Sequence, residues 1–162
     1  MKKRIYVETT IPSFYFETRT ESDMVSRRDW TVQWWDRLGE KYELVTSEAV
    51  IDELQSGNHP ARDECLRLIE KVSVLPATER LSEIVTAYVR HRVMPADPVG
   101  DALHLAFASY YRCDYLVTWN CRHLANANKF EHIRIVNAML GLFVPNLVTP
   151  LELLSEEESD ER

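Results

Sequence analysis

The hydrophobic residues of this chain fall into short runs, separated by longer segments with a helical period. Runs of three or four apolar and β-branched residues, bounded by polar or turn-forming residues, are typical of buried strands. We therefore expect five strands, at Arg4–Val7, Glu43–Thr46, Val72–Leu75, Tyr115–Thr118 and Leu147–Thr149.

The segments between these runs repeat their apolar residues every three or four positions, as amphipathic helices do. One of them also has start signals, because Asp97 is a suitable N-cap and Pro98 suits the first helical position. Helices are predicted over 22–38, 47–55, 60–71, 78–92, 98–111 and 130–142.

Strands that alternate with helices indicate β-α-β crossovers, and hence an α/β fold with a mainly parallel central sheet and helices on both faces. The 162 residues suffice for one domain. The final eight residues, 155–162, hold five acids and one base, a composition typical of a disordered segment. We expect a single domain over 1–154 and an acidic tail over 155–162.

Glycine and cysteine usage exclude several classes of protein. The four glycines are far apart, so neither a dinucleotide-binding fingerprint nor a phosphate-binding P-loop can be built. The cysteines, Cys65, Cys113 and Cys121, are odd in number and form no CxxC pair, which fits a reducing cytosol. Glu8 and Pro12 interrupt any apolar signal sequence, so we expect a cytoplasmic protein with no membrane association.

The formal net charge of −7 argues against a protein that binds nucleic acid through its overall field. The charge is uneven, however. The acidic tail carries −4, and the remaining 21 acids and 18 bases leave the domain with −3. Acidity therefore does not exclude a nucleic-acid partner.

Polar residues follow the predicted strands at the edge where parallel sheets bind ligands. Glu8 follows the first strand, Glu53 lies in the helix after the second, and Asp101 lies near the start of a later helix. Asn120 follows the fourth strand. Single acids near helix starts are common, since they favour the helix dipole. Several acids with few basic partners favour instead a site for a divalent metal ion.

Three segments resemble the PIN-domain nucleases: VETT near the N-terminus, TSEAVIDEL, and DALHLAFASYYRCDYLVTWN. The similarity extends from Ile5 to about Leu154 and is strongest to the members linked to toxin–antitoxin modules. The resemblance implies a PIN-like fold, and a site in which Glu8, Glu53, Asp101 and Asn120 hold Mg²⁺ or Mn²⁺ against an RNA phosphodiester.

The resemblance also implies a function: a metal-dependent endoribonuclease, the toxin of a type II toxin–antitoxin pair. Its partners would be an RNA substrate, a small antitoxin protein and a second copy in a homodimer. Thr10, Ser47 and His104 would support the ligands through hydrogen bonds.

Two positions depart from the family pattern, which has aspartate at Glu8 and an acid at Asn120. The neutral amide lowers the formal charge of the quartet from −4 to −3 and weakens binding of a hard cation. A PIN-like domain without catalysis, which binds RNA or protein, is therefore the alternative hypothesis.

Other candidate sites have less support. Cys121 and His123 lack a second Cys/His pair for zinc, and no GxSxG motif marks a serine hydrolase.

Trp30, Trp34 and Trp35 have helical spacing, which favours a role in the core or in a dimer contact. Four arginines are either phosphate contacts or part of a solvated face: Arg19, Arg27, Arg28 and Arg37.

Overall fold

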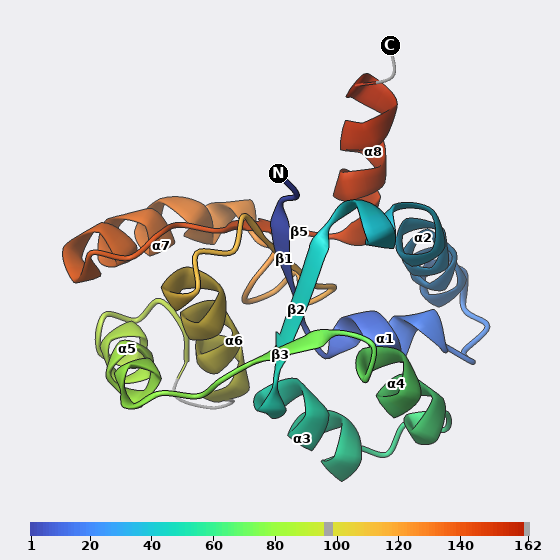
Figure 1. Cartoon of the computed structure of the whole chain (residues 1–162), viewed down its shortest axis with the longest axis horizontal. Helices are drawn as coiled ribbons and strands as arrows, with labels where there is room; N and C mark the ends of the chain where they lie inside the picture. The colour runs from blue at the N-terminus through green and yellow to red at the C-terminus, as the bar shows by residue number, and fades with distance from the viewer. Residues whose placement is uncertain (96–98, 161–162) are drawn as a thin grey trace.

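The computed structural model describes residues 1–95 and 99–160, and these form one α/β domain around a five-stranded sheet (Figure 1). Every strand pair is parallel, and the strand order is β3-β2-β1-β4-β5. The predicted α/β fold is confirmed. The strands are β1 (Arg4–Val7), β2 (Glu43–Ser47), β3 (Ser73–Leu75), β4 (Tyr115–Val117) and β5 (Asn146–Val148).

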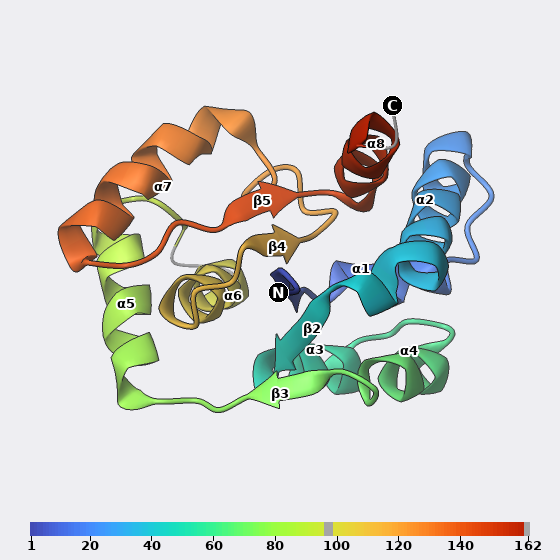
Figure 2. The same cartoon turned by 45° about the horizontal axis from the view of Figure 1, so that its top comes forward.

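Eight α-helices connect and cover the strands in the described part of the chain. In Figure 2, α5, α6 and α7 lie on one side of the sheet, and α1, α2, α4 and α8 lie on the other. None of these helices is long and apolar enough to span a membrane. Their bounds are α1 (Thr10–Tyr15), α2 (Ser22–Leu38), α3 (Glu48–Ser56), α4 (Arg62–Ile69), α5 (Glu79–Arg90), α6 (Val99–Tyr110), α7 (Ala127–Leu140) and α8 (Pro150–Asp160).

The central strands are buried on both faces, as parallel strands between helices must be. Tyr6 and Leu116 pair in register and are fully buried, and Trp34 from α2 packs in the same core. Val7 pairs with Val117 at the carboxyl ends of β1 and β4. Residues that follow these two strands therefore emerge at the same edge of the sheet.

Two helices were not predicted from the sequence. The six residues of α1 are too few for a periodic pattern and include Pro12. The acidic segment expected to be disordered is helical as far as Asp160, as the end of α8. Glu156 accepts hydrogen bonds from the Tyr115 hydroxyl, and Glu157 pairs with Lys41, so contacts with the domain hold this helix in place. The expected helix start at Asp97 and Pro98 lies outside the described residues.

Candidate active site

His104, on α6, is the common neighbour of the three predicted acids. It is 2% exposed, and its Nε2 lies 2.9 Å from Glu53 Oε1. Burial alone would lower the pKa of His104, but the hydrogen bond to Glu53 and the charges of Glu53, Glu8 and Asp101 raise it. The charges of three carboxylates, one directly after β1 and the others on α3 and α6, therefore act on one buried imidazole.

Glu8 follows β1 directly and is 3% exposed. Its Oε1 accepts a hydrogen bond from the backbone N–H of Thr10 at 2.5 Å, and its Oε2 accepts one from the Thr118 hydroxyl at 3.0 Å. Burial raises the pKa of Glu8, although the charge of His104 and these hydrogen bonds oppose the shift. Glu8 is thus a fixed carboxylate that a nearby cation would stabilise.

Glu53 reaches the site from α3. Besides the contact with His104, it accepts a hydrogen bond from the Thr9 hydroxyl. Its burial raises the pKa, but the hydrogen bond and charge of His104 and the bond from Thr9 outweigh this and lower it. Glu53 is therefore held in its ionised form.

Gly100 is what allows Glu53 to approach α6 closely. A Cβ atom at this position would lie 2.6 Å from Glu53 Oε1, closer than two such atoms can approach. The absence of a side chain at Gly100 therefore leaves room for the carboxylate beside His104.

Asp101 and Asn120 form a pair between α6 and the loop after β4. Asn120 Nδ2 donates to Asp101 Oδ1 at 3.0 Å. Asn120 Oδ1 accepts from the backbone N–H groups of Arg122 and His123, at 3.2 and 3.0 Å. The amide thus fixes Asp101, and its own oxygen is occupied by two donors from the loop.

The predicted supporting residues lie in the same region. His104 Nδ1 is 2.7 Å from the Tyr6 hydroxyl, which is 2.7 Å from Ser47 Oγ. Ser47 therefore reaches Glu53 only through Tyr6 and His104. Thr10 contacts Glu8 through its backbone N–H, while its hydroxyl accepts a hydrogen bond from the Trp119 N–H at 2.8 Å.

The oxygens at this site are hard ligands of the kind that Mg²⁺ and Mn²⁺ prefer. One observation fits a cation: Asp101 Oδ2 is buried and has no hydrogen-bond partner among the described residues. In that same part of the chain, however, no three His, Cys, Asp or Glu side chains are grouped as ligands of one ion. The oxygens of Glu8 and Glu53 face protein donors instead.

Other predicted candidates lie apart from the acids or have other partners. Trp34 is buried, while Trp30 stacks on Trp119 and Trp35 packs edge-on against Tyr15. Packing in the core is therefore confirmed for Trp34, whereas Trp30 and Trp35 are half-buried against its edge. The four arginines differ in their contacts. Arg19 and Arg28 pair with Glu17 and Asp29, the guanidinium of Arg27 lies over the rings of Phe14 and Trp119, and Arg37 is exposed.

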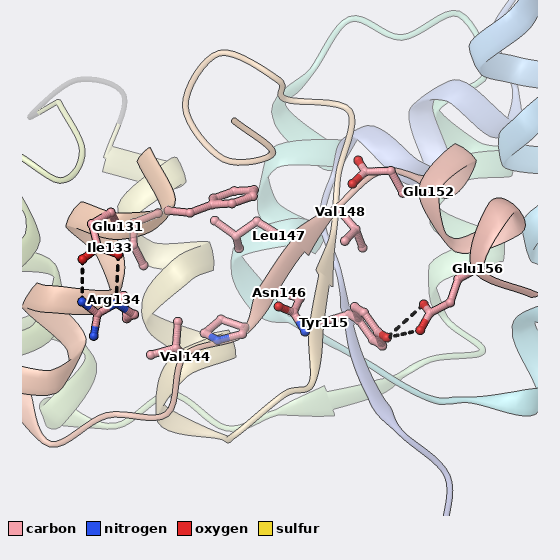
Figure 3. A pocket seen from close by; sticks show the side chains of 12 residues that line it. Tyr115, Glu131, Ile133, Arg134, Val144, Asn146, Leu147, Val148, Glu152 and Glu156 are labelled. Atoms are coloured by element: carbon pink, nitrogen blue, oxygen red, sulfur yellow. Dashed lines mark hydrogen bonds and ion pairs between the residues drawn. The ribbon is translucent and has the colours of Figure 1, made fainter. Parts of the chain in front are cut away.

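A cavity of about 510 Å³ lies along β5, between α7 and α8 (Figure 3). Its wall includes Tyr115, Val144, Leu147 and the ion pair of Glu131 with Arg134. The four predicted ligands do not line it, so it is separate from the carboxylate site.

Comparison with known proteins supports the fold. No family model and no curated protein matches this sequence. Among solved structures, the chain is similar to a chain in the crystal structure of VapBC2 from Rickettsia felis bound to a DNA fragment from their promoter. The TM-score is 0.54 at 15% sequence identity, over 90% of this chain and 96% of that chain. The fold is PIN-like. At this identity the similarity extends to the fold alone.

Sequence reasoning missed three contributors to the site. Thr9 and Thr118 donate hydroxyl hydrogen bonds to Glu53 and Glu8, and Tyr6 links His104 to Ser47. Thr9 lies in the VETT motif and Thr118 ends the predicted fourth strand, so their positions at strand ends were the available signal.

Proposed function

We propose that this chain is a metal-dependent endoribonuclease that hydrolyses RNA phosphodiester bonds. The observation that carries the proposal is that Glu8, Glu53 and Asp101 lie at the carboxyl edge of the sheet, where Glu53 contacts His104 and the charges of all three acids raise the pKa of His104. The unpaired buried oxygen of Asp101 and the PIN-like fold support it.

Glu8, Glu53 and Asp101 are the residues that would hold Mg²⁺ or Mn²⁺, and Asn120, the fourth predicted ligand, would bind the ion only if its oxygen left the backbone N–H groups of Arg122 and His123. Such an ion supplies a bound water of lowered pKa and neutralises charge that develops on the phosphate. The surrounding residues keep the carboxylates in place. Thr10 and Thr118 hold Glu8, His104 and Thr9 hold Glu53, and Asn120 holds Asp101.

The hydrogen-bond chain behind Glu53 has a defined direction. A carboxylate only accepts, so His104 Nε2–H donates to Glu53. When His104 is protonated, its Nδ1–H donates to the Tyr6 oxygen, and the Tyr6 hydroxyl donates to Ser47. These hydrogen bonds position Glu53, and they keep the positive charge of protonated His104 close to the three acids.

An RNA cleavage assay with Mn²⁺ tests the proposal. We expect Asp101→Asn and Glu53→Gln each to reduce cleavage by about 10²-fold or more, since both remove a charge that a metal ion requires. Asp52→Asn, an exposed acid next to Glu53 on α3, is the matched control and should cleave like the wild type. Cleavage that persists in both site variants would contradict a nuclease role for these residues.

We further propose that the protein is the toxin of a type II toxin–antitoxin pair, neutralised by a small antitoxin protein and active as a homodimer. The PIN-like fold shared with a chain of VapBC2 supports this assignment. Induced expression should arrest growth in the wild type but not in Asp101→Asn. Sedimentation of the purified protein tests whether it is a dimer. If the wild-type protein cleaves RNA but its expression leaves growth unaffected, the toxin role is contradicted.

A catalytically inactive PIN-like domain that binds RNA is the second candidate. The observation that favours it is Asn120, whose oxygen accepts two backbone hydrogen bonds in a position where the family has an acid. Binding of RNA without cleavage, with any divalent metal, would select this alternative.

A further inference from the structure

A cationic cavity lies between the end of α5, the loop after β4 and the start of α7. It is a shallow depression, widely open to solvent, with a volume of about 500 Å³. Among the described residues no carboxylate lines it, and none forms an ion pair with its cations. Arg92, Arg122 and Lys129 give this lining a positive charge that attracts anions, and Asp101 is the described acid whose charge acts on Lys129. The lining residues are Val89, Arg92, Met94, Pro95, Arg122, His123 and Lys129.

This cavity adjoins the carboxylate site. The backbone N–H groups of Arg122 and His123 donate to Asn120 Oδ1, and Asn120 Nδ2 donates to Asp101. Two residues of the cavity wall are thus one hydrogen bond from Asn120 and two from Asp101.

Lys129 is fixed at the boundary of the two regions. Its Nζ donates to the Val93 carbonyl oxygen at 2.9 Å. Burial lowers the pKa of Lys129, and the negative charge of Asp101 opposes this shift. The ammonium group is therefore immobilised close enough to Asp101 to interact with its charge.

We propose that this cavity binds the phosphate groups of an RNA strand next to the phosphate that lies at Glu8, Glu53 and Asp101. The proposal rests on the proposed function. A strand that passes the carboxylates must leave them across a neighbouring surface, and this surface carries the cations that the carboxylate site lacks. Arginine presents several N–H donors in a fixed plane that matches phosphate oxygens.

The mixed lining favours RNA over an acidic peptide. Val89 and Pro95, which are half-buried, offer apolar surface beside Arg92 and Arg122, whereas Met94 is buried beneath them. A nucleotide combines a charged phosphate with a flat apolar base, and single-stranded RNA binds to surfaces that contact both. A peptide that binds through its carboxylates alone would leave the apolar part uncovered.

The chain offers a matched pair of arginines for the test. Arg92 and Arg112 are both exposed, both follow a helix and both have positive φ, 57° and 56°. Glycine adopts this conformation without strain, so Arg92→Gly and Arg112→Gly remove the same charge while the backbone is preserved. Only Arg92 lines the cavity, and Arg112 lies over Phe143.

The measurement is the anisotropy of a short labelled oligouridylate, in EDTA, over about 50–200 mM salt. Each lost phosphate contact reduces the slope of log K against log salt by about 0.7 for a single strand. We expect a reduction of about 0.7 for Arg92→Gly and about 1.4 for Arg92→Gly with Arg122→Gln. The double variant should bind about tenfold more weakly than the wild type at low salt.

Arg112→Gly, alone or with Arg67→Gln on the surface of α4, is the control and should keep the wild-type slope. Equal effects in cavity and control variants would overturn the proposal, as would a wild-type protein that binds no RNA at low salt. Loss of binding to a labelled glutamate-rich peptide, with RNA binding unchanged, would assign the cavity to a protein partner and also overturn it.

The cleavage assay separates this proposal from the nuclease assignment. If the cavity variants lose RNA binding and the wild type never cleaves, the phosphate site stands and the nuclease fails. If Asp101→Asn abolishes cleavage while the cavity variants bind and cleave like the wild type, the nuclease stands and the phosphate site fails.

Discussion

Gly100 tests whether the precise position of Glu53 matters. An alanine Cβ would lie 2.6 Å from Glu53 Oε1, which is the end of a flexible side chain. The fold of Gly100→Ala should therefore survive, because Glu53 can move, but Oε1 cannot stay 2.9 Å from His104. We expect RNA cleavage to fall by about 10-fold to 10²-fold, as a misplacement of about 1 Å does at other sites.

Gly39→Ala is the matched control. Gly39 has helical dihedral angles, φ −53° and ψ −39°, and a Cβ there would meet its nearest neighbour, in Leu44, at 3.9 Å. The substitution should leave cleavage unchanged and raise the free energy of unfolding by about 0.4–1 kcal/mol. Equal cleavage by both alanine variants would show that Glu53 needs no fixed position.

The three cysteines should differ sharply in reactivity. Burial raises the pKa of Cys65 to about 11 and that of Cys113 to about 12, whereas Cys121 is exposed. Since the thiolate is the reactive form, a disulfide reagent should modify one thiol in the native protein and all three in denaturant. Cys121→Ser should abolish modification of the native protein. A second thiol that reacts in the native protein would contradict the burial of Cys65 and Cys113.

At the level of residues, the sequence identified the acids together with His104 and Thr10, but not the other groups that orient them. Glu53 and Asp101 stood out because acids are unusual beside apolar helical positions. Thr9, Thr118 and Tyr6 carry no such signal, since a hydroxyl at the end of a buried strand has several possible partners. Only the packing of β1 against β4 brings the Thr118 hydroxyl to Glu8.

At the level of elements, hydrophobic periodicity located all five strands and six helices to within a few residues. It missed α1, whose buried residues Ile11, Pro12 and Phe14 span a single turn. It missed α8 because its acidic composition indicates disorder, while contacts with Tyr115 and Lys41 stabilise the helix. Tertiary contacts thus stabilise α1 and α8, the two helices that the local hydrophobic pattern does not predict.

The connection between α1 and α2 should confer acid sensitivity. Glu17 is 7% exposed, and hydrogen bonds from Arg19, opposed in part by burial, lower its pKa from 4.5 to about 2. A lowered carboxyl pKa stabilises the native state above the unfolded-state pKa. This contribution is therefore complete above about pH 4.5 and disappears as the pH falls to about 2.

Urea unfolding of Glu17→Gln measures the effect. We expect a loss of under about 1 kcal/mol at pH 6, because Arg19 is exposed and water screens the pair, and a smaller loss at pH 3. Glu21→Gln, an exposed acid at the end of the same connection, is the control and should show no such trend. A loss in the free energy of unfolding that is the same at both pH values would contradict the role of the Glu17 charge.

At the level of the whole molecule, two acidic regions lie at opposite ends of the sheet. Glu8 follows the carboxyl end of β1, whereas Glu156 on α8 contacts Tyr115, the first residue of β4. Figure 1 shows α8 extending away from the edge where α3 and α6 begin. The four acids at the end of α8, Glu156, Glu157, Glu158 and Asp160, therefore lie far from the candidate metal site, and the remaining net charge is spread over the acids and bases of the domain.

Removal of residues 155–162 changes the net charge from −7 to −3, since five acids and one base are lost. At about 0.15 M ionic strength the Debye length is about 8 Å, so charges at the far end of the domain are screened from the RNA site. We expect the truncated protein to bind oligouridylate within about twofold of the wild type at this salt, and more tightly only near 0.01 M, where the Debye length is about 30 Å. Binding tenfold tighter at 0.15 M would instead indicate that the acidic end of α8 folds back over the RNA-binding surface. Circular dichroism provides the control, because the loss should be confined to the last turns of one helix while the domain remains folded.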